Sequence, residues 1–295
     1  MRLIQLSLTL TVVGLVSSCG GGSGSSADQS DIAVNVSSVT ALPEGDVMHY
    51  GAITVSDDIG VAFDVVGSFY TLGQGVSADY LLTMLNGETT HCHIQDDGVV
   101  DFEEISVGFT PYVPDSEKQM VSAGDAVVLS TPSGTYVSLQ EQTAGSFLFY
   151  DLPSGSQLPQ GSIPDELVVS VTGSQEIPPF MNALVPTIPT LTGVNFNTDS
   201  SVSIDTRFSW EPSGNPQALV RIQTQTAGGF FREDGVSVAC VTPDSGTFTF
   251  PPGIQSLLGE GFVGEPPVMS RLLVNATKDS DTVLFVVRES FAEEF

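Results

Sequence analysis

Basic side chains are scarce in this chain. Eight Lys and Arg residues stand against 35 Asp and Glu residues, which gives a formal net charge of −27. Only Lys118 and Lys278 are lysines. A surface with this excess of negative charge repels phosphate backbones and anionic lipid headgroups. We therefore exclude nucleic acids as partners, and we exclude binding to an anionic membrane surface through a basic patch.

The apolar run that begins the chain is too short to span a bilayer. It covers residues 3–16, and polar residues such as Gln5 and Ser7 interrupt it. A membrane-spanning helix needs about 20 apolar residues. A short apolar run behind one early positive charge, Arg2, is typical of a removable secretory signal. We predict that residues 1–18 are a signal peptide.

Cys19 follows this leader, directly after the small residues Ser17 and Ser18. The arrangement resembles a bacterial lipoprotein signal, in which the cysteine is lipidated and becomes the new N-terminus. The resemblance implies several acyl chains such as palmitate on Cys19, and several chains together anchor a protein stably. Gly20 stands where an inner-membrane retention signal would place Asp, so we expect an outer-membrane anchor with the body facing the periplasm or the cell surface. Ordinary signal cleavage, with Cys19 merely nearby, is the alternative.

Large apolar residues are missing from residues 20–30, which are rich in Gly and Ser. Such a composition cannot bury enough apolar surface to fold and stays flexible. We predict a tether over residues 19–45, with the lipidated Cys19 at its start. A flexible segment of this kind lets a folded body stand clear of the lipid headgroups.

Motifs of nucleophilic and phosphate chemistry are absent. The chain has no Gly-x-Ser-x-Gly segment, and its glycines do not form a phosphate-binding loop. Two carboxylates could hydrolyse glycosides, but 35 acidic residues form many accidental pairs and no motif selects one of them. We predict that the chain is not an enzyme, and we assign no catalytic residue.

Histidine is rare, and two of the three histidines flank a cysteine in His91-Cys92-His93. In a strand, His91 and His93 project from one face and Cys92 from the other. Two histidines on one face can begin a zinc or copper site, which a carboxylate such as Glu88 or Asp96 could complete. Surface histidines beside a core cysteine are the alternative.

The densest acidic cluster contains Asp96, Asp97 and Asp101, followed by Glu103 and Glu104. Carboxylate oxygens are the ligands that Ca²⁺ takes, so the three aspartates are candidate calcium ligands. Their spacing does not match the twelve-residue calcium loop, which needs Gly at its sixth position and Glu at its twelfth. A hydrated acidic surface is the alternative. Apart from calcium we expect no cofactor.

Two segments share one pattern. Cys92 and Cys240 are each followed by Asp after four residues, by Gly after six and by Phe after ten. Asp and Gly supply turn chemistry, so each copy indicates a tight connection between two strands, with the cysteine facing the core. In two separate domains the cysteines would lie farther apart than the roughly 7 Å that a bridge allows. We predict two buried free thiols. A Cys92–Cys240 disulfide, which an oxidising compartment favours, is the alternative.

Sustained helical periodicity is absent. Short β-rich runs alternate with Gly, Pro, Asn and Asp breaks, which is typical of all-β sandwiches. Prolines crowd between residues 177 and 189, close to where we place a domain boundary. We predict an all-β fold of two tandem β-sandwich modules, residues 46–185 and residues 186–295. Trp210 ends an apolar–polar alternation and is expected to pack in the core of the second module.

Several segments, in this order, resemble a group of uncharacterised bacterial secreted proteins and lipoproteins. They are residues 121–134, residues 167–173, Phe208-Ser-Trp210, and Ala239-Cys240 followed by residues 245–252. The resemblance implies immunoglobulin-like β-sandwich architecture over roughly residues 90–290. It implies no activity and no catalytic residues.

Together these features predict a lipid-anchored envelope protein with a structural or binding role, such as adhesion or scaffolding. Its partner would be another envelope protein or a glycan. One alternative is a carbohydrate-binding or carbohydrate-processing module, in which loops at one end of a sandwich hold the sugar. The other is an envelope protein that binds a divalent metal.

Overall fold

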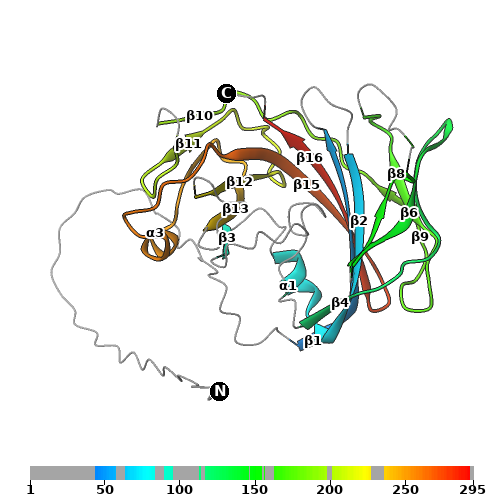
Figure 1. Ribbon diagram of the computed structural model, residues 1–295. Coiled ribbons are helices and arrows are strands. Elements are labelled where there is room, and N and C mark those ends of the chain that lie inside the picture. The colour runs from blue at the N-terminus through cyan, green and yellow to red at the C-terminus, as the bar shows by residue number, and fades with distance from the viewer. Residues whose placement is uncertain are drawn as a thin grey trace, which may run out of the picture. The chain divides into compact units, whose positions relative to one another are not determined.

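The computed structural model (Figure 1) describes most of the chain after residue 43. The described residues are 44–57, 64–83, 90–95, 113, 117–145, 147–154, 156, 163–197, 201–226 and 236–292. All of them belong to one compact unit, residues 32–295. Strands dominate this unit and its described helices are short, so the prediction of a mostly β fold is confirmed.

One sheet of thirteen strands contains most of the described strands. Its strands from the first half of the chain are β1 (Glu44–Asp57), β2 (Asp64–Val76), β3 (His91–Gln95), β4 (Lys118–Met120), β5 (Ala126–Thr131), β6 (Gly134–Ala144) and β7 (Phe147–Asp151). Those from the second half are β8 (Val168–Val171), β9 (Phe180–Leu184), β12 (Leu219–Gln225), β13 (Ser237–Pro243), β15 (Val268–Asp279) and β16 (Thr282–Phe291).

The order of the strands in this sheet does not follow the chain. It runs β3-β13-β12-β15-β16-β1-β2-β7-β6-β5-β8-β9, with β4 paired to β2. Among the described pairs only β1 and β16 run parallel. The terminal strand β9 also contacts β15 and β16. There the side chain of Asn275 donates a hydrogen bond to the carbonyl oxygen of Leu184 (2.9 Å).

The prediction of two tandem sandwiches is not confirmed. Strands from residues 46–185 and from residues 186–295 are direct neighbours in the one sheet, at β1–β16 and at β3–β13. The physical reason lies in β16, where residues 282–290 are all buried. A strand that is buried on both faces needs cover above and below and partners on both sides. Here β15 and β1 are those partners, and β1 comes from the opposite end of the chain.

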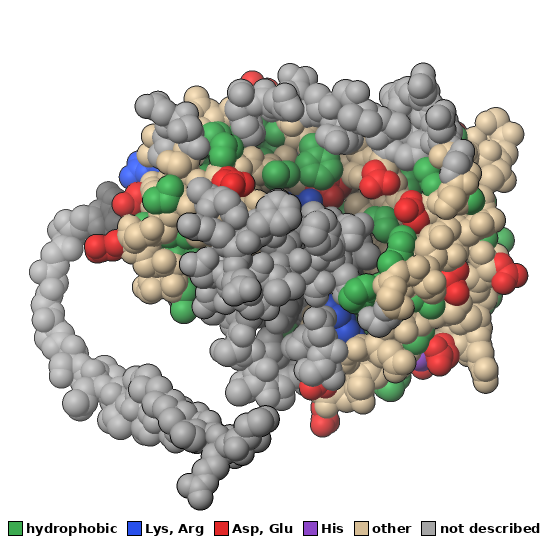
Figure 2. Space-filling view, viewed as in Figure 1, with side chains coloured by type: hydrophobic (Ala, Val, Ile, Leu, Met, Phe, Trp, Pro, Cys, Tyr) green, Lys and Arg blue, Asp and Glu red, His purple; other side chains and the backbone are tan. Residues whose placement is uncertain are grey.

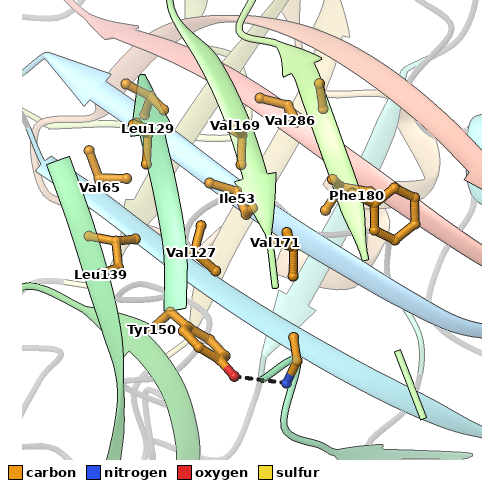
Figure 3. Packing of buried hydrophobic residues seen from close by; sticks show 14 of the residues in the cluster. Ile53, Val65, Val127, Leu129, Leu139, Tyr150, Val169, Val171, Phe180 and Val286 are labelled. Carbon is orange, nitrogen blue, oxygen red and sulfur yellow. Dashed lines mark hydrogen bonds between the residues drawn. The ribbon is translucent and has the colours of Figure 1, made fainter. Parts of the chain in front are cut away.

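The largest cluster of buried side chains lies on one face of the sheet from β16 to β9 (Figure 3). Alternate residues of β1, β5, β6, β8 and β16 belong to it, among them Ile53 and Val55 of β1 and Leu284 and Val286 of β16, and residues of β2, β7, β9 and adjoining loops complete it. Alternation follows from strand geometry, because successive side chains point to opposite faces. Truncating one of these aliphatic side chains to alanine would cost about 2–5 kcal/mol of stability.

Tyr150 closes this cluster at one end (Figure 3). Its hydroxyl accepts a hydrogen bond from the N–H of Ala123 (2.8 Å) and donates one to the carbonyl oxygen of Gly124 (2.7 Å). Gly124 has a φ of 101°, and a Cβ at this position would come within 2.1 Å of the carbonyl oxygen of Gly173. The turn therefore requires glycine, and Tyr150 fixes it to the core.

The opposite face of β1, β2 and β16 carries a second cluster of buried side chains. Tyr50, Tyr70 and Phe285 belong to it, and the rings of Tyr50 and Tyr70 stack with their centroids 4.9 Å apart. The short helix α1 (Ala78–Thr83) contributes the buried Leu81. With one cluster on each face, the middle of β1 is buried continuously from Tyr50 to Val55.

The described strands also form a small antiparallel sheet, which does not pair with the large sheet. It consists of β10 (Asn195–Phe196), β11 (Arg207–Ser209) and β14 (Thr247–Thr249). Phe208 and Phe248 of this sheet share a buried cluster with residues of β12, β13 and β15 and with Ile254 of α3 (Pro252–Leu258). Trp210 is buried in the same cluster, as predicted.

Candidate functional site

The predicted site residues differ in whether the structure describes them. Cys19 and the candidate calcium ligands Asp96, Asp97 and Asp101 lie outside the described residues. His91 and His93 have backbone positions in β3. Cys92 and Cys240 are both fully described. Among the described residues, no group of three His, Cys, Asp or Glu side chains lies close enough together to hold a metal ion.

A disulfide joins Cys92 of β3 to Cys240 of β13. The two residues are direct partners in the antiparallel β3–β13 ladder, with Cα atoms 4.0 Å apart and sulfur atoms 2.08 Å apart. The expectation of two free thiols in separate cores is therefore not met. It assumed that the two copies of the repeat lie in two domains, whereas their strands lie side by side in one sheet.

The pairing register relates the two copies by a local twofold axis. Because Cys92 opposes Cys240, the residues after one cysteine oppose the residues before the other: Ile94 faces Val238 and His91 faces Val241. The turn expected after the second cysteine is present, and Gly246 adopts the positive φ of 88° that favours glycine. The repeat thus identified equivalent strand positions but not their separation in space.

Asp244, predicted only as a turn residue, is the centre of a buried polar network. Its carboxylate lies 3.0 Å from Nε of Arg271 and accepts hydrogen bonds from the indole N–H of Trp210 (2.6 Å) and the backbone N–H of Ser213 (2.8 Å). The side chains of Arg271 and Asp244 are 2% and 1% exposed. The same guanidinium donates to the carbonyl oxygens of Thr190 and Glu211. This network ties β15 to the loops beside the small sheet.

A second ion pair, between the partly buried Arg221 and the buried Glu289, lies on the other face of the sheet. Nη2 of Arg221 in β12 is 2.6 Å from Oε1 of Glu289 in β16, and the hydroxyl of Ser270 donates to the same oxygen (2.5 Å). The guanidinium also lies over the ring of Phe291, 6.0 Å from its centroid. Its Nε is buried without a hydrogen-bond partner.

Cross-strand pairing places the backbone of His91 in line with Arg221 of this second ion pair, across neighbouring strands. Val241 is the partner of both His91 and Arg221, and Arg221 is the partner of Ser270. Directly opposed residues in antiparallel strands lie on the same face. The candidate site is therefore this face of β3, β13, β12, β15 and β16, where a histidine position, a guanidinium and a carboxylate share one region.

A third ion pair joins β1 and β16 near their C-terminal ends. Nη2 of Arg288 lies 2.7 Å from Oδ2 of Asp57, and Nη1 donates to the carbonyl oxygen of Val55 (3.3 Å). Burial lowers the pKa of Arg288 below its ordinary value, and the charge of Asp57 opposes that shift. Arginine still remains protonated at neutral pH, so this pair acts through charge and packing.

In each of the three pairs the charged groups contact each other, and Arg271 and Arg288 also contact backbone oxygens. Buried charges need such partners because removing them from water is costly. Sequence reasoning missed Arg221, Arg271 and Glu289. The available signal was a charged residue inside an apolar strand, since Arg and Glu are almost never fully buried unless paired.

Acidic side chains are spread over several parts of the face shown in Figure 2 rather than gathered in one place. None of the described helices is both long enough and apolar enough to cross a membrane. Comparisons of the chain with protein-family models, with curated proteins and with solved structures found no match.

Proposed function

We propose that this chain is a lipid-anchored protein of the bacterial cell envelope, held at the outer membrane through Cys19, with a structural or binding role and no catalytic activity. The disulfide between Cys92 and Cys240 is the observation that carries the proposal. Disulfides form and persist in oxidising compartments such as the periplasm and the cell surface, and they are rare in the cytosol. Export agrees with the leader over residues 1–18.

The contacts that the interior charged side chains make support a structural or binding role. Asp244 and Arg271 bind each other, an indole N–H and backbone groups. Glu289 binds Arg221 and the hydroxyl of Ser270. Groups held in this way position strands and loops. A binding role would draw on the sheet face that carries Arg221.

For the architecture, we propose a sandwich in the second half of the chain. The small sheet β10–β11–β14 and the strands β12, β13 and β15 share one buried cluster, and two sheets with a common core are the arrangement of a sandwich. Immunoglobulin-like topology stays a prediction from the sequence. A separate first module does not form part of the proposal, because β1 and β3 pair with strands of the second half.

Metabolic labelling with a clickable fatty acid tests the anchor. The full chain should carry the label and sediment with outer membranes. A Cys19→Ser variant should lose the label and become soluble after export, because position 19 then has no sulfur to carry the lipid. A Ser26→Ala variant in the tether is the matched control and should behave like the natural chain. An unlabelled natural chain would refute the proposed anchoring.

Metal binding and carbohydrate binding stay as alternatives, and each has a direct test. Calorimetry with zinc should give no heat with the mature protein if His91 and His93 are not ligands, and a signal lost in a His91→Ala/His93→Ala variant would establish a site. A melting temperature raised by millimolar calcium after chelation would support calcium ligation by the aspartates between residues 96 and 101. Binding on a glycan array would favour the carbohydrate alternative.

A further inference from the structure

The environment of Cys92 is built from the far end of the chain. β3 ends the strand order of the large sheet and pairs only with β13 among the described strands. Cys92 belongs to a buried cluster whose other buried members described here all come from residues 191–269. Cys92 is 6% exposed and Cys240 is fully buried. Neither the pairing of β3 nor the enclosure of its sulfur can therefore arise before the second half of the chain is present.

The central strand β1 also depends on the far end of the chain. β1 pairs in parallel with β16, the last described strand. Side chains of β16 enter both clusters that flank β1: Leu284 and Val286 on one face, Val283 and Phe285 on the other. During export from the N-terminus, β1 consequently lacks one of its two neighbours until residues 282–291 are exported. The thiol of Cys92 has no native strand partner until residues 237–243 of β13 are exported.

A free thiol on Cys19 would compete for Cys92 during this interval. The two residues lie about 70 positions apart, whereas Cys92 and Cys240 are separated by 148. In an unfolded chain the probability that two residues meet falls as about the 3/2 power of their separation. Cys92 would then meet Cys19 about three times as often as it meets Cys240. With all three thiols free, only about a quarter of the first bridges would be Cys92–Cys240.

We propose that acylation of Cys19 precedes and protects the oxidative step that forms the Cys92–Cys240 bridge. The inference rests on the proposed lipidation of Cys19 and adds a second role to it. A lipid attached to the sulfur of Cys19 removes the competing thiol. Two thiols then remain in the chain, and they can pair within it in only one way. The anchor thereby acts as a protecting group for disulfide pairing.

The oxidative step needs a partner of defined chemistry, a dithiol–disulfide oxidoreductase of the envelope in its disulfide form. The sulfurs of Cys92 and Cys240 lose two protons and two electrons and form one S–S bond. The S–S bond of the oxidoreductase breaks and takes up the two electrons and two protons as two thiols. Exchange proceeds by attack of a thiolate on a disulfide sulfur, so it must occur while both sulfurs are still accessible.

Two exported chains test whether a free thiol on Cys19 competes for Cys92. In both, a leader from a secreted protein that is not lipidated replaces residues 1–18. One chain keeps Cys19 as a free thiol, and the other carries Cys19→Ser. Thiols are blocked at short times after export, and the bridged peptides are identified by mass spectrometry. We expect Cys92–Cys240 to be the single bridge in the Cys19→Ser chain, and to make up about a quarter of the first bridges in the other.

Equal fractions of Cys92–Cys240 among the first bridges of the two chains would overturn the inference. An experiment in vitro could also overturn it: both chains would be reduced and unfolded in guanidinium, and each would then form only the Cys92–Cys240 bridge on oxidation. Failure of the anchor is a separate result: fatty-acid labelling of the natural chain reports it directly. The comparison of the two unlipidated chains holds whether or not that label is found.

Discussion

Removal of the Cys92–Cys240 bridge should lower the free energy of unfolding by about 5 kcal/mol at 25 °C. The bridge closes a loop of 148 residues, and cross-linking a loop of that length removes about 17 cal/mol/K of entropy from the unfolded chain. Domains are stable by only about 5–15 kcal/mol. The reduced protein should therefore be close to unfolding at room temperature.

Guanidinium titration of the oxidised and reduced proteins measures this difference. Trp210 is the one tryptophan in the chain and is 5% exposed, so its fluorescence reports the folded core directly. Reduction should move the midpoint to lower denaturant and steepen the transition, since an unbridged unfolded chain exposes more surface. A Cys92→Ala/Cys240→Ala variant should resemble the reduced protein and should not respond to reductant. Oxidised and reduced stabilities within about 1 kcal/mol of each other would refute the loop-entropy argument.

Three further outcomes follow from the buried and exposed polar contacts. Arg271→Met should cost about 3–5 kcal/mol in thermal unfolding, because it leaves the carboxylate of Asp244 buried without a counter-charge. An Arg271→Met/Asp244→Leu variant should regain much of that stability, and no gain over the single variant would contradict the explanation. Tyr150→Phe should cost about 1–3 kcal/mol in urea unfolding, because a buried backbone N–H loses its acceptor; an unchanged midpoint would show that the hydroxyl is dispensable. The hydrogen bond and the charge of Lys278 lower the pKa of Asp46 below 3.8, so this contact stabilises the fold at neutral pH and is lost as the pH falls through that lowered pKa. Lys278→Met should raise the pKa of Asp46 toward 3.8 in an NMR titration, and an unmoved pKa would rule out the pairing.

Local features of the fold were predictable because neighbouring residues determine them. The apolar, β-branched run from Ala126 to Ser130 predicts a strand and lies in β5. Gly246 takes its positive φ, and Trp210 packs in a core. Each of these depends on side-chain periodicity or on backbone freedom within a few residues.

The candidate site was predictable only in part. The sequence pattern identified Cys92 and Cys240 as equivalent positions, and it placed His91 beside one of them. The prediction of two free thiols in separate cores was wrong, because a repeat carries no information about the distance between its copies. The ion pair of Arg221 with Glu289 joins residues 68 positions apart, on strands that are not adjacent in the sheet. No local pattern links such partners.

By itself the sequence determined a mostly β chain with a strongly acidic surface, and the positions of several turns and core residues, because these depend on composition and short-range periodicity. Its leader also predicts the lipid anchor, which labelling of Cys19 will test. Only the tertiary structure decided that β1 lies beside β16, that β3 lies beside β13, and that a disulfide joins the two cysteines. The physical reason is that a strand presents similar edges and faces to many partners. Which pairing buries both faces of β16 depends on contacts from the whole chain.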